Sequence, residues 1–133
     1  MEQKEKNGRK ILIIDDDSFL LDMYALKFTQ EGFAVSSARG TLEALEKLQT
    51  GENPDIILVD IVMPAMDGFE FLAKVNEEGL AKHAMKVCLS NLGQQEDIDK
   101  GLQLGASGYI VKASATPSEV VQKVEEMIQK RKK

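Results

Sequence analysis

The chain has 133 residues, of which 43% are hydrophobic and 29% are charged, and its formal net charge is −5 at pH 7. This size and composition are typical of one globular domain with a single sizeable core. The negative charge argues against nucleic acid as a direct partner, and no apolar run is long enough for a membrane-spanning helix. The single cysteine, Cys88, forms no internal disulfide, which suits a reducing cytoplasm.

Apolar runs indicate five strands that alternate with helical patterns along the chain. The first and third runs are continuously apolar, as in strands that are buried on both faces, whereas the second is more polar and indicates an edge strand. We expect the strands at residues 10–15, 33–38, 55–60, 86–90 and 109–112.

Between these strands, apolar residues recur at helical spacing, and glycine or proline marks several helix boundaries. The boundaries predicted for the helices are Ser18 to about Gln30, an end at Gly51, a helix between Gly68 and Gly79, and a start near Pro117. The expected apolar stripes are Phe19, Leu20, Met23, Leu26 and Phe28 in the first helix; Leu42, Leu45 and Leu48 in the second; Phe69, Leu72 and Val75 in the third; Ile98 and Leu102 in the fourth; and Val120, Val121, Val124, Met127 and Ile128 in the last.

Strand–helix units of this length predict an α/β fold with a doubly wound five-stranded parallel sheet and helices on both faces. Right-handed crossovers allow few strand orders, and the common order for five such units is the flavodoxin-like 2-1-3-4-5. In that order the polar second strand lies at an edge. Ligands bind outside the carboxyl ends of the strands, at the switch point between strands 1 and 3.

Polar side chains stand at the carboxyl ends of four predicted strands. Strand 1 ends in Asp15 and Asp16, strand 3 in Asp60, strand 4 in Ser90 and strand 5 in Lys112. Because neighbouring strands are about 4.8 Å apart, the carboxylates of strands 1 and 3 should almost touch. The lysine is two strands from Asp60, roughly 10 Å, which only a long side chain can span. The sequence therefore predicts a single site.

The residue types at this site indicate phosphoryl chemistry. Clustered carboxylates favour a hard cation such as Mg²⁺, which binds a few protein oxygens and shares a phosphate. A lysine and a hydroxyl supply a positive charge and a donor for phosphoryl oxygens. Asp60 is central, and a carboxylate is deprotonated at neutral pH, so it can attack phosphorus without a general base. We infer transfer of a phosphoryl group onto Asp60.

The segments "ILIIDDDS", "DIILVDIVMPAMDG", "KVCLSN" and "GYIVK" resemble, in order and spacing, the motifs of the receiver domain of two-component response regulators. The resemblance covers roughly residues 9–130. It implies these roles: an acidic pair in Asp15 and Asp16, with Asp16 a direct Mg²⁺ ligand; the phosphoacceptor and a metal ligand in Asp60; a ligand in the backbone carbonyl of Val62; contacts to the phosphoryl group from Ser90 and Lys112; and a switch aromatic in Tyr109.

The resemblance also implies the partners and the output. The donor is expected to be a phosphohistidine on a sensor histidine kinase or histidine phosphotransfer protein, with Mg²⁺ as cofactor and Mn²⁺ as an alternative. The protein is expected to be cytoplasmic, a monomer or weak dimer, and not a multiple-turnover enzyme. Phosphorylation would switch the face formed by helix 4, strand 5 and helix 5 for binding a target that the sequence does not identify.

The expected domain organisation is a flexible tail at residues 1–9, the receiver domain at 10–130 and a basic end at 131–133. Two arrangements stay open: a stand-alone receiver, or a domain cut from a longer protein.

Two positions bear on the switch geometry. The family usually has a cis proline after the lysine, but here Ala113 follows Lys112. Since a non-proline cis bond costs about 3–4 kcal/mol, we expect a trans bond with a rebuilt loop over "ASAT", the alternative being a strained cis bond. Ser90 lacks the methyl group of threonine, so Tyr109 is expected to sample both of its rotamers and to become buried on phosphorylation.

Two further positions bear on the lifetime of the phosphoryl group. In the family, the side chains two residues after the phosphoacceptor and two after the hydroxyl residue are best placed to hold the hydrolytic water. Here they are Val62 and Leu92, which cannot hydrogen-bond to water. We therefore expect a long-lived phosphoryl state.

The acidic residues also allow two alternatives, a phosphatase and a binding scaffold. In haloacid-dehalogenase-type phosphatases Asp15 would be the nucleophile and Asp17 the acid, with Ser90 on the phosphate, but those enzymes need acidic metal ligands after the lysine. No aspartate follows Lys112, and Asp60 would have no role. A receiver-like binding scaffold would normally have a broken site. Asp17 is predicted to cap the first helix, and Asp67 to shape the turn before the third helix.

Overall fold

The computed structural model describes residues 7–131, in which five parallel strands form one sheet in the order β2-β1-β3-β4-β5. The predicted fold class and strand order are confirmed. The strands are β1 (Lys10–Ile14), β2 (Ala34–Ala38), β3 (Ile56–Val59), β4 (Met85–Ser90) and β5 (Gly108–Val111). The helices are α1 (Ser18–Gln30), α2 (Thr41–Gln49), α3 (Gly68–Glu78), α4 (Gln95–Gln103) and α5 (Pro117–Arg131), with a short 3₁₀ helix, η1, at Lys112–Ser114.

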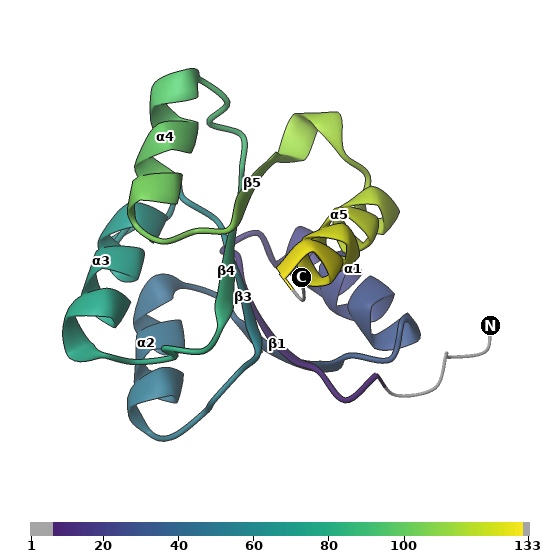
Figure 1. The fold of residues 1–133 in the computed structure, drawn as a ribbon, viewed down its shortest axis with the longest axis horizontal. Coiled ribbons are helices and arrows are strands. Elements are labelled where there is room, and N and C mark those ends of the chain that lie inside the picture. The colour runs from purple at the N-terminus through teal and green to yellow at the C-terminus, as the bar shows by residue number, and fades with distance from the viewer. Residues whose placement is uncertain (1–6, 132–133) are drawn as a thin grey trace.

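Helices cover both faces of the sheet, with α1 and α5 on one side and α2, α3 and α4 on the other (Figure 1). Because side chains alternate along a strand, β1 supplies both core layers. Ile11 and Ile13 pack in the α1 and α5 layer, and Leu12 and Ile14 in the opposite layer. These four side chains are buried, as the continuous apolar run predicts, and only Lys10 of β1 is exposed.

The predicted strands end one residue too late at three sites. Asp15, Asp60 and Lys112 lie just after the last residues of β1, β3 and β5, outside the ladder. Because these residues follow the strands, their charged side chains need not alternate between the two faces of the sheet. They can lie together at its carboxyl edge instead.

The apolar stripe predicted for α1 is only partly correct: Phe28 is buried as predicted, and Leu20 packs against the core. The structure buries Leu21, Tyr24 and Phe28 there, whereas Phe19 is 72% exposed and Leu26 is 51% exposed. Apolar residues occur all round this helix, so periodicity alone could not select the face, and contact with the sheet and α5 selects it.

Leu42 and Leu102 are also not in the core, in contrast to the predicted stripes. Leu42 is 57% exposed on α2 and Leu102 is 46% exposed on α4. The stripes of α3 and α5 are confirmed, except that Met127 is only partly buried.

The bond between Lys112 and Ala113 is trans, since no residue of the described range 7–131 has a cis peptide bond. The chain after Lys112 instead turns through η1, which confirms the expected trans bond with a rebuilt loop. Pro117 is the first residue of α5, as predicted, and Gly79 ends α3 in the left-handed conformation (φ 67°).

The terminal segments are only partly within the described residues. Of the expected N-terminal tail, residues 1–6 lie outside, while Asn7 and Arg9 are hydrogen-bonded to the start of β2: the Asn7 N–H donates to the Gly32 carbonyl and the Ala34 N–H to the Arg9 carbonyl. Of the basic end, Arg131 donates to the His83 carbonyl and residues 132–133 lie outside. Within the described part, no helix has the length and apolar character needed to cross a membrane.

Candidate functional site

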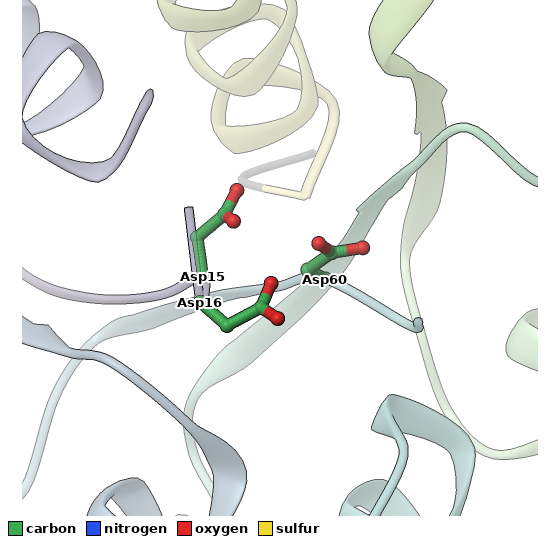
Figure 2. Close-up of side chains that lie close together, drawn as sticks. All are labelled: Asp15, Asp16 and Asp60. Carbon is green, nitrogen blue, oxygen red and sulfur yellow. The ribbon is translucent and has the colours of Figure 1, made fainter. Parts of the chain in front are cut away.

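Three carboxylates meet at the carboxyl ends of β1 and β3. Ligand oxygens of Asp15, Asp16 and Asp60 lie within 4.8 Å of one another, and Figure 2 shows the three side chains next to each other. Parallel pairing sets their positions, because the Asp60 N–H donates to the Ile14 carbonyl at 3.0 Å. The structure therefore confirms that the ends of strands 1 and 3 meet at this edge, as predicted.

Lys112 reaches this cluster from the end of β5. Its Nζ lies 2.7 Å from Asp15 Oδ2 and donates a 2.9 Å hydrogen bond to Asp60 Oδ2. Asp15 and Asp60 are almost fully buried, as is the side chain of Lys112, whereas Asp16 is exposed. The long lysine side chain spans the gap across β4, as its length predicts.

Burial and pairing act in opposite directions on these groups. Burial raises the pKa of the Asp15 carboxyl, against the contact with Lys112 and the Asp17 N–H, which lower it. Burial by itself would lower the pKa of Lys112, but its contacts with Asp15 and Asp60 outweigh this and raise it. The lysine therefore stays cationic across the neutral range.

The remaining carboxylate oxygens accept backbone hydrogen bonds. The Asp17 N–H donates to Asp15 Oδ1 at 2.9 Å, and the Val62 N–H donates to Asp60 Oδ1 at 3.3 Å. These bonds fix the orientation of two of the three carboxylates. Three carboxylates face one ammonium group, so the donor set and its charge fit a divalent cation with hard oxygen ligands.

Ser90 and Tyr109 form a second group of contacts at the ends of β4 and β5. Ser90 is fully buried, and its Oγ accepts a hydrogen bond from the Leu92 N–H at 3.3 Å. The Tyr109 hydroxyl donates a 2.6 Å hydrogen bond to the Leu92 carbonyl. Burial is the main cause that raises the pKa of Tyr109 to about 12. The loop after Ser90 thus holds the tyrosine hydroxyl.

Asp17 is a helix cap, as predicted, and Asp67, which is predicted to shape the turn before α3, also caps that helix. The Asp17 side chain accepts from the Leu20 N–H and caps α1. The Asp67 side chain accepts from the Glu70 N–H, and the Glu70 side chain in turn accepts from the Asp67 N–H, which forms a capping box at α3.

Gly68 is a site residue that the sequence reasoning did not single out for the chemistry. Its N–H donates to the Ile61 carbonyl at 2.8 Å, and a Cβ at this position would overlap the Asp60 carbonyl oxygen and the Ile61 backbone. Only glycine lets the start of α3 approach the segment after Asp60 so closely. The "DG" pair after the proline is the sequence signal that points to it.

Exposed apolar side chains follow several of the site residues in the chain. Val62 is 58% exposed just after Asp60, Leu92 is 36% exposed after Ser90, and Phe19 is exposed at the start of α1. The positions predicted to influence hydrolysis are therefore surface positions beside the site.

Residues 11–125 match the family described as "Response regulator receiver domain". The chain is 32% identical over 111 residues to the chemotaxis protein CheY of Halobacterium salinarum, covering 84% of this chain and 90% of that protein. It is also 32% identical over 125 residues to the alkaline phosphatase synthesis transcriptional regulatory protein PhoP of Bacillus subtilis, covering 92% of this chain but only 50% of that protein.

Solved structures are similar over nearly the whole chain. The receiver domain protein of Methanospirillum hungatei has a TM-score of 0.82 at 29% identity, covering 97% of this chain and 98% of its own. Vibrio cholerae CheY4 has a TM-score of 0.81 at 28% identity, covering 90% and 98%.

Proposed function

The chain belongs to the response-regulator receiver family, as a CheY-like receiver domain of two-component signalling, and on that premise we propose that it accepts a phosphoryl group on Asp60. One observation carries the proposal: the buried carboxylate of Asp60 lies close to the two aspartates that follow β1 and contacts the ammonium group of Lys112. The proposed receiver domain extends over residues 10–130.

In the proposed reaction a carboxylate oxygen of Asp60 attacks the phosphorus of a phosphohistidine. The new P–O bond forms as the P–N bond breaks, and the imidazole leaves with the electron pair. Lys112, which pairs with Asp60 Oδ2, is placed to exchange this partner for a phosphoryl oxygen. Ser90, on the strand between those that precede Asp60 and Lys112, would donate a hydrogen bond from its hydroxyl to another phosphoryl oxygen.

Receiver domains bind Mg²⁺ at an acidic pocket, and the carboxylates found together here fit that ion. The ligands we propose are Asp15, Asp16, Asp60 and the backbone carbonyl of Val62, with Mn²⁺ as an alternative to Mg²⁺. When bound, the ion offsets the charge that develops on the phosphoryl oxygens. The protein contributes the fixed carboxylates, two of them held by backbone N–H groups.

We propose that a helical donor, on a sensor histidine kinase or histidine phosphotransfer protein, docks on α1. Phe19, Met23 and Leu26 follow one another at i, i+4 and i+7 on this helix, and Phe19 and Leu26 are exposed. The stripe starts two residues after Asp17, whose N–H is bonded to Asp15. An apolar surface thus begins next to the proposed phosphoacceptor site.

The proposed output is a change in the face formed by α4, β5 and α5, for a target protein that stays unassigned. Tyr109 would be the link, because its hydroxyl is bonded to the segment that follows Ser90. We propose no multiple turnover: the domain would catalyse only its own phosphorylation and dephosphorylation.

Incubation with Mg²⁺ and a small acyl phosphate, followed by intact mass measurement, tests the proposal. Wild type should gain a single phosphoryl mass, Asp60→Asn should gain none, and a chelator should prevent the gain. Asp67→Asn is the matched control, because this acidic residue caps α3 and should be labelled like wild type. Equal labelling of Asp60→Asn, or none of wild type, would refute the assignment. Turnover of a phosphomonoester would instead indicate the phosphatase reading.

A further inference from the structure

Helix α4 packs on the sheet through a glycine. Within α4, which lies wholly inside the described range 7–131, Gly101 is the only buried residue. It lies over the cross-strand pair of Cys88 on β4 and Tyr109 on β5. A Cβ at Gly101 would lie 3.1 Å from Cys88 Sγ and 3.3 Å from Tyr109 Cδ2. The missing side chain therefore lets the helix backbone come close to both.

Neighbouring contacts restrict how α4 could yield to a side chain at this position. The Lys100 Nζ lies 4.8 Å from the centroid of the Phe69 ring, which connects α4 to the first turn of α3. Cys88 is 0% exposed and belongs to the core cluster. The thiol is therefore enclosed by the packed core, and the contact between Lys100 and Phe69 ties α4 to α3.

The Tyr109 ring is the partner that can move. It is only partly buried, and the hydrogen bond from its hydroxyl to the Leu92 carbonyl is its anchor at the outer end. Rotation about χ1 would take the ring away from Gly101 and break this bond.

We propose that Gly101 is a positioning residue for Tyr109: by carrying no side chain, it allows the ring to lie under α4 with its hydroxyl on Leu92. A methyl group at this position would press on the ring and push it outward by a few tenths of an ångström. This inference extends the proposed function, because its consequence for signalling rests on Tyr109 acting as the switch. The position of the ring can be measured whether or not Tyr109 is a switch.

The test uses Gly101→Ala in a Tyr24→Phe background, which leaves Tyr109 as the single tyrosine of a chain with two. Fluorotyrosine incorporation and fluorine NMR then report the ring directly. We expect the Tyr109 resonance to shift toward that of the exposed, urea-unfolded chain. The melting temperature should change little, since the gain in helix propensity from alanine offsets the cost of the tight contact with Cys88. Leu102→Ala, at an exposed neighbouring position, is the control and should leave the resonance in place.

A second variant tests the contact itself. Adding Cys88→Ala to Gly101→Ala removes the nearer of the two contacts, so α4 can settle toward β4 and the resonance should return toward its original position. A resonance in Gly101→Ala that matches the Leu102→Ala control would overturn the proposal, as would a lower melting temperature without a shift. Labelling of Asp60 by acyl phosphate is measured in parallel. If no variant is labelled but the Tyr109 resonance still shifts in Gly101→Ala, the result would count against the proposed function and leave this inference intact.

Discussion

At the scale of single residues, the site holds charged side chains that are almost fully buried. Asp15 is 1% exposed and Asp60 is 6% exposed, and both contact the ammonium group of Lys112. Buried charges are stable only when they are paired, and removing one partner leaves the others uncompensated. The residues proposed for the chemistry therefore also control stability.

Lys112→Ala should accordingly be strongly destabilising at pH 7. Loss of one partner of a buried ion pair typically costs about 3–5 kcal/mol, which urea unfolding would measure. The deficit should shrink as the pH falls, because burial raises the pKa of Asp15 above its unfolded value, so the folded state takes up the proton first and loses the repulsion.

Lys47→Ala is the matched control for this lysine, because Lys47 pairs with Glu52 at 3.5 Å on the surface. Such exposed pairs contribute about 0–1 kcal/mol. Similar losses for the two variants would show that the buried pairing at Lys112 contributes little.

The proposed lifetime of the phosphoryl group depends on Val62 and Leu92. Replacing them by Val62→Asn with Leu92→Glu supplies polar groups beside the site that can hold the attacking water. Since groups positioned for proton transfer typically change rates by about 10²–10⁴-fold, we expect phosphate loss to accelerate by roughly tenfold or more. The decay is followed by intact mass after the donor is removed. Leu42→Glu, an exposed leucine on α2, should decay like wild type; an unchanged rate in the double variant would show that these side chains do not limit hydrolysis.

At the scale of secondary structure elements, the start of α3 links helix formation to the site. Asp67 closes the capping box, and Gly68 brings the helix against the backbone that follows Asp60. Two adjacent residues thus have separable effects: one stabilises the helix, and the other permits close packing.

Gly68→Ala should therefore affect the site, and Asp67→Ala should not. The added Cβ overlaps the Asp60 carbonyl, so we expect a loss of about 1–3 kcal/mol of stability together with slower labelling by acyl phosphate. Asp67→Ala should cost about 1 kcal/mol through the lost cap and leave the labelling rate unchanged. Equal labelling rates in the two variants would contradict this separation.

At the scale of the whole molecule, the sheet brings residues that are far apart in the chain to one edge, and α1 stands beside that edge with an exposed apolar stripe. Phe19→Ser should slow phosphotransfer from a histidine phosphotransfer protein that labels the wild-type chain. A loss of tenfold or more corresponds to about 1.4 kcal/mol, within the range of an interface anchor. Labelling by a small acyl phosphate should be unchanged, because that donor needs no docking surface. Leu42→Ser is the control, and equal slowing with both donors would indicate a defect in the site instead.

The sequence alone determined the order and type of the elements and the composition of the acidic site. Continuous apolar runs identify buried parallel strands, and the polar residues at their ends must share one edge because all the strands run in the same direction. That reasoning was sufficient to place Asp15, Asp16, Asp60 and Lys112 together, as the contacts in the structure confirm.

Only the tertiary structure decided which helix faces are buried and how α4 contacts the sheet. On α1 nearly every face carries apolar residues, so the side that packs against α5 is fixed by the neighbouring elements and not by the local pattern. The role of Gly101 could not be identified from the sequence. It depends on the contacts of this helical glycine with Cys88 and Tyr109, which lie on the separate strands β4 and β5. Such contacts depend on the distance between packed backbones, and local sequence patterns do not encode that distance.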